Sequence, residues 1–384
     1  MKVSIISHTY ADKKNQEKIL ALSRYPDLSI QVIVPSYFLV RDTGHVLKPD
    51  DASGGNYAVS IVRPRLVLGG GMRFPIRFSA GTTFIYDPWP LYKALKDFRP
   101  DIIHLEQEPW SLSALEVTLI NKAIKAKLIT STLENVDRRY PPPFRQIYRY
   151  VLSKTDSIMA CTHEAKDILA QRGYRNASAV TYLGLDPQIY KRKDVTELKK
   201  QLRLSKFVIG YMGRLVPEKG VLDLVRACAT LEGDFHLLIV GSGPLRDEVL
   251  RVADTLGIGD RLRLVPWVNY EHVADHLCLM DVFVHPSRTT TWWREQYNHT
   301  ILEAMACEIP VICSDSGGNP RMVRDIGYIF RESDVEDLQE KIHLVMQDAA
   351  VRALMAKRGR EEILQRYTHE KVAEGLYNFY HSSL

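Results

Sequence analysis

The segment 213–220 places two cations in a loop bounded by glycines. It follows an apolar stretch that predicts a strand, and Gly213 allows the backbone to turn tightly after it. Arg214 supplies a planar fork of donors, whereas Lys219 supplies a mobile point charge. Together with free amides at the start of the next predicted helix, these side chains predict a diphosphate site. The alternative is a solvated loop with an ion pair to Glu218.

A second glycine-containing turn, residues 241–244, follows another apolar stretch. No third glycine follows at the helix start, so the turn lacks the full fingerprint of a nicotinamide-dinucleotide site. Gly241 and Gly243 would let a flat base or a ribose approach bare backbone. A plain tight turn explains these glycines equally well.

The polar loop that ends at Asn298 carries the densest set of candidate groups. Asn298 is a good N-cap for a helix with an apolar stripe. Glu295 in the loop and Glu303 on the helix could hydrogen-bond separate diols that flank a phosphate. The alternatives are an exposed loop carboxylate for Glu295 and a structural salt bridge for Glu303. A second anion site is predicted at the free amides of Asn298, His299, Thr300 and Ile301.

The elements that must position these groups are short apolar strands alternating with amphipathic helices. The predicted strands are residues 3–6, 30–34, 102–105, 128–130, 157–160, 207–211, 236–240, 262–265, 282–284 and 311–313. The predicted helices are residues 13–23, 112–127, 195–202, 219–230, 244–256, 270–279 and 299–307. This alternation predicts α/β architecture with parallel sheets, which bind ligands at the carboxyl ends of their strands.

Length and composition favour a globular chain of two domains. A chain of 384 residues rarely forms one domain, and a polar stretch near residues 187–200 marks a boundary. We therefore expect domains at 1–190 and 191–366, followed by a helical segment, 367–384, that could cross back to the first domain. Balanced charge with many β-branched and aromatic residues excludes disorder as the main state.

The sequence contains no apolar run of about 18 residues, so it predicts no membrane-spanning helix. The apolar start of the chain is too short for a signal peptide and predicts a buried strand instead. The five cysteines show no metal-ligand spacing, so we expect buried thiols in a reducing compartment. The alternative is a metal or redox site.

The net charge of +5 is distributed unevenly along the chain. Residues 1–190 carry 25 Lys and Arg against 18 Asp and Glu, whereas the remainder carries 26 against 28. A solvated surface explains this difference. The alternative is that the first half meets an anionic partner, either a phosphate-bearing ligand or a membrane face.

The order of these motifs resembles the family 4 retaining glycosyltransferases of GT-B fold. The resemblance is carried by Gly-Arg-x-x-x-Glu-Lys-Gly at 213–220, Gly-Ser-Gly-Pro at 241–244, and Glu295-x7-Glu303 with Ala-Met-Ala at 304–306. Pro-Ser-Arg-Thr-Thr at 286–290 and Cys-Ser-Asp-Ser-Gly-Gly at 313–318 are similar to the bacterial exopolysaccharide branch. The resemblance is strong over residues 205–325 and looser over 1–190. It implies two Rossmann-like domains with parallel sheets that face a central cleft.

The resemblance also implies roles for matching residues. Arg214 and Lys219 would hold the donor diphosphate, Glu303 would bind the ribose, and Glu295 would bind the transferred sugar beside Gln296 and Tyr297. Trp267 and Val268 would line the nucleobase, with the end of a core strand as an equal alternative. The implied donor-binding residues are Gly213, Arg214, Lys219, Gly241, Gly243, Trp267, Val268, Asn298, His299, Thr300, Ile301 and Glu303.

In the first domain, the segment 103–109 follows a strand and opens a helix. Glu106 would face the reacting centre and complete a catalytic set with Arg214, Lys219 and Glu295, unless it only stabilises the helix start. Glu108 and Arg138 are acceptor candidates, whereas His104 is interpreted as a satisfied strand residue. The arginine-rich segments 63–78 and 138–145 could form an acceptor groove, rest on an anionic membrane, or be ordinary loops.

Several positions depart from the family pattern. The loop 8–15 lacks paired glycines, and Lys13 or Lys14 could compensate. The other departures are Tyr297, Asn298, Glu308 and Arg321, which affect the expected shape of the sugar pocket. Glu308 replaces a glycine at a helix end, where a left-handed conformation would cost about 1 kcal/mol.

The resemblance implies hexose transfer with retention at the anomeric carbon, without a metal or other cofactor. The donor would be a nucleotide diphosphate sugar, UDP-glucose by resemblance alone, and the acceptor a saccharide or lipid-linked saccharide in envelope polysaccharide synthesis. We expect a cytoplasmic location, with peripheral contact to an anionic membrane left open, and no nucleic-acid partner. The alternatives are a nucleotide-sugar epimerase, a phosphorylase, or a non-enzymatic scaffold that binds membranes or polyanions.

Overall fold

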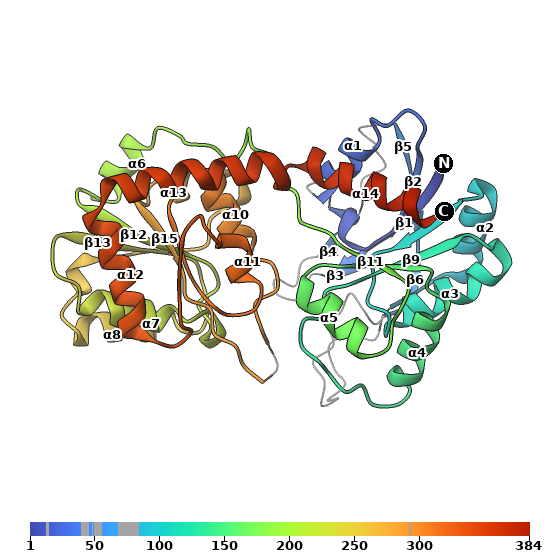
Figure 1. Cartoon of the computed structure of the whole chain (residues 1–384), viewed down its shortest axis with the longest axis horizontal. Coiled ribbons are helices and arrows are strands. Elements are labelled where there is room, and N and C mark those ends of the chain that lie inside the picture. The colour runs from blue at the N-terminus through green and yellow to red at the C-terminus, as the bar shows by residue number, and fades with distance from the viewer. Residues whose placement is uncertain (13–14, 40–45, 48, 50–55, 68–83, 292) are drawn as a thin grey trace. The chain divides into compact units, whose positions relative to one another are not determined.

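The chain forms two compact units that are each built on a parallel sheet (Figure 1). This computed structural model describes residues 1–12, 15–39, 46–47, 49, 56–67, 84–291 and 293–384. The first unit comprises Met1–Tyr182 with His369–Leu384, and the second comprises Leu183–Thr368. Lys13, Lys14 and most of the basic segment 63–78 lie outside the described residues.

The first unit contains a seven-stranded parallel sheet in the order β11-β10-β9-β8-β1-β2-β5. Its strands are β1 (Lys2–Ile6), β2 (Ser29–Pro35), β5 (Tyr57–Val62), β8 (Ile102–Leu105), β9 (Lys127–Thr132), β10 (Ser157–Ala160) and β11 (Ala177–Val180). Two small antiparallel pairs join β3 (Phe38–Leu39) to β4 (Val46–Leu47) and β6 (Pro64–Val67) to β7 (Phe84–Tyr86). The predicted strands 102–105 and 157–160 match β8 and β10, which are buried along their whole length.

The helices of the first unit cover both faces of this sheet. They are α1 (Glu17–Leu22), α2 (Pro88–Phe98), α3 (Leu112–Ile124), α4 (Phe144–Lys154), α5 (His163–Gln171) and α14 (His369–Ser383). The helix predicted at 112–127 ends three residues early, because Lys125 is left-handed, with φ 65°, and β9 begins at Lys127. Among the described residues of the helix predicted at 13–23, the helical ones are Glu17–Leu22, and a 3-10 turn at Thr9–Ala11 precedes them.

Helix α14 carries the C-terminal residues of the chain into the core of the first unit. Val372, Leu376 and Tyr380 are buried in one apolar cluster with Val3 and Ile5 of β1. This burial explains why the apolar residues of the last segment recur at helical spacing.

The second unit contains a six-stranded parallel sheet in the order β14-β13-β12-β15-β16-β17. Its strands are β12 (Phe207–Met212), β13 (Phe235–Val240), β14 (Leu262–Val265), β15 (Val282–His285), β16 (Val311–Ser314) and β17 (Tyr328–Phe330). Its helices are α6 (Thr196–Gln201), α7 (Val221–Ala229), α8 (Arg246–Thr255), α9 (Val273–Leu277), α10 (His299–Ala306), α11 (Asn319–Val323), α12 (Val335–Gln347) and α13 (Ala349–Glu362). The helix predicted at 270–279 is instead a 3-10 turn at Tyr270–His272 followed by the short α9, because the His272 amide bonds three residues back, to Asn269.

The order of strands determines where each unit can bind a ligand. In the second sheet the chain runs outward from β12 to β14 and then returns to β15, on the other side of β12. In the first sheet β1 has β2 on one side and β8 on the other. Such reversals leave a crevice at the carboxyl ends of the two adjacent strands. The loops after β12 and β15, and those after β1 and β8, are therefore the expected binding loops.

Two local predictions are confirmed. All five cysteines are buried and free of disulfides, as expected for thiols that act as small apolar side chains. Glu308 is left-handed, with φ 59°, at the end of α10, so it occupies the position where a glycine would be unstrained.

Candidate active site

Backbone contacts bring the turns after β12 and β13 together. The amide of Gly213 donates to Val240 at 3.0 Å, and the amide of Leu215 donates to Ser242 at 2.9 Å. Gly241 has φ 150°, and a Cβ there would lie 1.9 Å from the carbonyl oxygen of Gly213. The glycine at 241 is therefore required by this close approach of two chains.

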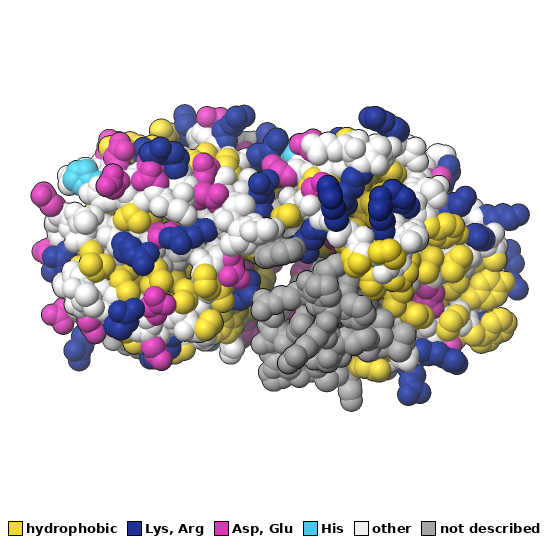
Figure 2. All heavy atoms as spheres, turned by 90° about the horizontal axis from the view of Figure 1, so that it is seen from below, with side chains coloured by type: hydrophobic (Ala, Val, Ile, Leu, Met, Phe, Trp, Pro, Cys, Tyr) yellow, Lys and Arg dark blue, Asp and Glu magenta, His cyan; other side chains and the backbone are white. Residues whose placement is uncertain are grey.

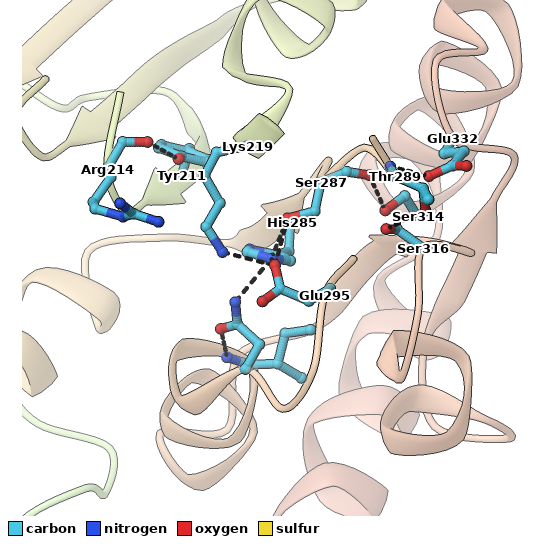
Figure 3. A network of polar contacts seen from close by, with 12 residues as sticks. Tyr211, Arg214, Lys219, His285, Ser287, Thr289, Glu295, Ser314, Ser316 and Glu332 are labelled. Atoms are coloured by element: carbon cyan, nitrogen blue, oxygen red, sulfur yellow. Dashed lines mark hydrogen bonds and ion pairs between the residues drawn. The ribbon is translucent and has the colours of Figure 1, made fainter. Parts of the chain in front are cut away.

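Arg214 and Lys219 extend from the loop after β12, as predicted (Figure 3). The Arg214 side chain is exposed, while its backbone carbonyl accepts a 2.7 Å hydrogen bond from the Tyr211 hydroxyl. Lys219 is only 12% exposed and reaches the carboxylate of Glu295 at 2.7 Å. Its ammonium also lies 4.8 Å from the centre of the Trp293 ring, a cation–π contact.

Glu295 lies at the centre of a buried polar cluster (Figure 3). One oxygen, Oε2, receives Lys219 Nζ at 2.7 Å, His285 Nε2 at 2.8 Å and Ser287 Oγ at 2.7 Å. Burial opposes ionisation of Glu295, but the hydrogen bond from His285 and the charge of Lys219 hold its pKa well below the usual range. The alternative of an exposed loop carboxylate is therefore wrong for Glu295, which is 5% exposed.

Backbone contacts fasten the loop that carries Glu295. The amide of Gly318 donates to the Glu295 carbonyl at 3.1 Å, and a Cβ at Gly317 would lie 1.9 Å from the same oxygen. The Ser314 hydroxyl donates to the Ser287 carbonyl at 2.5 Å, and the Thr289 amide donates to Glu332 at 2.5 Å. Gly317 thus allows the segment after β16 and the loop that carries Glu295 to meet backbone to backbone.

Sequence reasoning did not select His285 or Ser287, which both contact Glu295. His285 is the last residue of β15 and is 1% exposed. The available signal was its position, because polar residues at the carboxyl end of a strand next to the reversal of strand order tend to face the ligand.

Helix α10 begins as predicted. Asn298 caps it, with its Oδ1 accepting from the Ile301 amide at 3.2 Å. The prediction of a free amide is therefore wrong for Ile301, because the cap uses it. His299 is exposed and Thr300 is half-buried in the first turn. The Asn298 amide group also contacts His285 Nε2 at 2.8 Å, so the cap is joined to the Glu295 cluster.

Glu303 lies on α10 with its carboxylate beside the Tyr190 hydroxyl. Burial raises the pKa of Glu303 to about 7, and the contact with Tyr190 only partly offsets this effect. The described residues contain no salt bridge to Glu303, so the alternative of a structural ion pair finds no support there.

The remaining predicted donor residues flank this cluster along the chain. Trp267 follows β14, is 64% exposed, and donates its backbone amide to Ser242 Oγ at 3.2 Å. Val268 is half-buried beside it, as are Gln296 and Tyr297 in the loop before α10. The Tyr297 ring lies 6.0 Å from that of Tyr367.

In the first unit, Glu106 follows β8 and contacts residues that follow β1. Its Oε1 accepts from the Tyr10 hydroxyl at 2.7 Å and from Lys18 Nζ at 2.9 Å. Burial opposes ionisation, but Lys18 and the hydrogen bond from Tyr10 lower the pKa of Glu106 to about 2. His104 is 1% exposed and bonds to Tyr380 and Ser131, which agrees with the satisfied strand residue that was predicted.

The acceptor candidates Glu108 and Arg138 occupy different surroundings. Both Glu108 oxygens accept hydrogen bonds, from Thr132 at 2.8 Å and from the Leu133 amide at 2.7 Å, and burial raises its pKa to about 7. Arg138 is exposed, and its carbonyl accepts from Arg172 at 2.8 Å. The structure therefore gives Glu108 a structural task, fastening the loop after β8 to the end of β9.

The described residues show neither a cluster able to hold a metal ion nor a helix able to span a membrane. They contain no group of three or more His, Cys, Asp or Glu side chains arranged to hold a metal ion. No helix among them has the length and apolar character needed to cross a membrane.

Two family models match the chain over most of its length. The model described as glycosyl transferases group 1 matches residues 194–362, and the model described as glycosyltransferase family 4 matches residues 31–189. The chain therefore belongs to the family 4 glycosyltransferases, enzymes of GT-B fold.

Similar proteins come from several bacteria. The chain is 26% identical to an N-acetyl-alpha-D-glucosaminyl L-malate synthase of Bacillus anthracis, over 79% of this chain and 82% of the relative. It is 24% identical to the capsular polysaccharide biosynthesis glycosyltransferase CapM of Staphylococcus aureus, over 76% and 68%. The crystal structure of Anabaena HepE in complex with UDP superposes with a TM-score of 0.74 at 17% identity, and all of both chains is covered. At that identity the superposition shows a shared fold.

The raised pKa of Glu303 predicts a pH-dependent gain in stability for Glu303→Gln. In the folded chain its pKa is about 7, against 4.5 in the unfolded chain, so the burial penalty is absent below pH 4.5 and grows as pH rises to 7. Thermal unfolding should therefore show no gain at pH 4.5 and a gain of at most about 3 kcal/mol at pH 8. Glu361→Gln is the control, because that side chain is 53% exposed, and it should show no gain in stability at either pH. Equal effects of Glu303→Gln at both pH values would contradict this assignment.

Proposed function

We propose that this glycosyltransferase moves a hexose from a nucleotide diphosphate sugar, with retention and without a metal ion. UDP-glucose is the proposed donor, and the proposed acceptor is a saccharide or lipid-linked saccharide in envelope polysaccharide synthesis. The observation that carries the proposal is the contact between Lys219 and Glu295 at 2.7 Å. This contact supports the proposal, because the group proposed to bind phosphate lies beside the group proposed to bind sugar hydroxyls.

The loops around this contact offer groups for the diphosphate and the base of the proposed donor. Arg214, Lys219 and the amides at the start of α10 supply positive charge for the diphosphate. The exposed Trp267 offers a flat surface for a base. Uridine is favoured because HepE, which shares the fold, has been solved with UDP and with UDP-glucose. The role of CapM in capsular polysaccharide synthesis supports an envelope product.

The charges of the site support a mechanism without a metal. As the bond to the sugar breaks, negative charge grows on the leaving diphosphate, and fixed cations that meet this charge lower the barrier. Glu295 is a poor covalent nucleophile, because three donors hold its Oε2 and its pKa is strongly lowered. We therefore propose departure and attack on the same face of the sugar, with the leaving phosphate accepting the proton of the acceptor hydroxyl.

Glu106 is the proposed acceptor-orienting group of the first unit. Its Oε1 is held by Tyr10 and Lys18, and its low pKa keeps the carboxylate ionised at neutral pH. An ionised carboxylate that is fixed by its neighbours can accept a hydrogen bond from a hydroxyl of the acceptor or the sugar.

Replacing Lys219 by Ala should lower turnover by two to three orders of magnitude, because the leaving diphosphate loses a fixed cation. The measurement is release of nucleotide from UDP-glucose and related donors, with and without acceptor, in the presence of EDTA. Thermal-shift assays with a panel of nucleotide sugars then identify the base and the sugar separately.

Lys206→Ala is the matched control, since that lysine pairs with Asp234 on the surface. A rate near that of the wild type in Lys219→Ala would contradict the diphosphate assignment. Loss of wild-type activity in EDTA would contradict a metal-independent reaction. Isomerisation of the nucleotide sugar without net nucleotide release would favour an epimerase. Sugar phosphate formed from a saccharide and inorganic phosphate would favour a phosphorylase.

Replacing Glu106 by Gln should lower turnover about ten- to hundred-fold and leave donor binding unchanged, because the neutral amide accepts a weaker hydrogen bond. Turnover and the thermal shift with UDP-glucose are the two measurements. Glu374→Gln, on the exposed side of α14, is the control. An unchanged rate in Glu106→Gln would assign Glu106 a structural role.

Peripheral contact with an anionic membrane is proposed for the first unit. Trp89 at the start of α2 is 70% exposed, and Lys93, Lys96 and Arg99 follow it on the surface. One face of this unit shows many hydrophobic side chains, with Lys and Arg side chains at their edges (Figure 2). Exposed aromatic and basic side chains together are typical of surfaces that bind lipid headgroups.

The protein should therefore co-sediment with vesicles that contain phosphatidylglycerol and not with vesicles of phosphatidylcholine. Trp89→Ala and Lys93→Ala should each weaken this binding several-fold. Equal binding to both vesicles, or to neither, would remove the proposed contact.

A further inference from the structure

Lys219 must serve two anions if the proposed function is correct. In the structure it pairs with Glu295 at 2.7 Å, and both side chains are largely buried, at 12% and 7% exposed. A bound diphosphate would draw the ammonium toward itself. Glu295 would then keep its charge in a buried place with one donor fewer, which is costly unless other donors remain.

His285 is placed to be such a donor. It ends β15, whose residues are all buried, so its ring is held by the core of the second unit. Its Nε2 lies 2.8 Å from Glu295 Oε2 and 2.7 Å from Ser287 Oγ. Figure 3 shows Lys219 approaching the Glu295 carboxylate from one side, while His285 and Ser287 come from the end of β15.

The surroundings of the imidazole indicate which nitrogen carries its proton. His285 Nδ1 is buried and has no hydrogen-bond partner among the described residues. A proton on Nδ1 would leave a buried donor unsatisfied and would turn the lone pair of Nε2 toward the carboxylate. A proton on Nε2 avoids both costs and makes a charge-assisted hydrogen bond to Glu295.

The ring is neutral in this arrangement. Burial lowers the pKa of His285 below its usual value, and the nearby Lys219 charge acts in the same direction, although Glu295 opposes both. Asn298 opposes this assignment, because its Oδ1 accepts from the Ile301 amide and its NH2 group therefore faces Nε2 at 2.8 Å as a second donor. The charge-assisted hydrogen bond from Nε2 to the Glu295 carboxylate outweighs that contact. A neutral donor holds the carboxylate without competing with Lys219 for the diphosphate as a second cation would.

We propose that His285 is a positioning residue for Glu295: its Nε2–H keeps the carboxylate ionised and oriented toward the sugar after Lys219 has turned to the diphosphate. Ser287 is the second donor to the same oxygen. The proposal rests on the proposed function. It makes the affinity for the sugar part of the donor depend on His285, while the affinity for the nucleoside diphosphate depends on Lys219.

The test compares two amide replacements that differ in reach. The amide nitrogen of Gln can occupy the position of Nε2, whereas the shorter Asn places its amide near the position of Nδ1. His285→Gln should bind UDP-glucose and turn it over within a few-fold of the wild type. His285→Asn should bind UDP as the wild type does but lose about ten-fold or more in turnover and in the added affinity for UDP-glucose over UDP.

Calorimetric titrations with UDP and with UDP-glucose, together with kcat and KM, provide these readouts. His236→Asn is the matched control, because His236 is another buried strand histidine, in β13, and does not contact Glu295. Should His285→Asn fail to fold, Ser287→Ala removes the other donor to Oε2 and should show the same selective loss, though a smaller one.

Equal behaviour of His285→Gln and His285→Asn, whether both active or both impaired, would overturn the proposal. So would an equal loss of affinity for UDP and UDP-glucose in His285→Asn. A wild-type protein that binds no nucleotide sugar would instead contradict the proposed function itself, so the two failures are distinguishable.

Discussion

The ion pair between Lys219 and Glu295 is the interaction on which the site depends. Its partners are 76 residues apart and come from loops after two different strands, so the pair forms only if β12 and β15 are adjacent. Burying two opposite charges is costly unless each finds further partners. Glu295 finds them in His285 and Ser287, and Lys219 finds one in the Trp293 ring. The adjacency of β12 and β15 and the polar cluster around Glu295 are thus both needed for this buried ion pair.

The need to hold this ion pair also explains why backbone contacts fix the loops around Glu295. Gly317 lets the segment after β16 approach the Glu295 backbone, and the Gly318 amide donates to the Glu295 carbonyl. Thr289 and Ser287 are fastened to Glu332 and Ser314. A side chain held by packed strands and backbone hydrogen bonds keeps its geometry while a ligand exchanges partners beside it. The exposed Arg214 side chain lies outside this network.

The sequence predicted the fold well where the signal was local. Buried parallel strands are continuous apolar runs, so β8 and β10 were located to the residue, and Asn298 was identified as a cap by its type and position. Chain reversals were harder, because a lysine such as Lys125 carries no mark of its left-handed conformation. The motifs identified Lys219 and Glu295, but their contact, and the roles of His285 and Tyr190, depend on neighbours that only the tertiary fold brings together.

The contacts of the first unit indicate which basic residues of the first half can meet an anionic partner. Among the described residues at the carboxyl ends of its strands, two cations with little exposure are paired: Lys18 pairs with Glu106, and Arg172 pairs with Glu134 and Asp137. Glu108 adds a further carboxyl group there. The cations that follow Trp89 on α2 are instead exposed. Among the described residues, the exposed cations after Trp89 therefore fit an anionic partner better than the paired cations at the strand ends do.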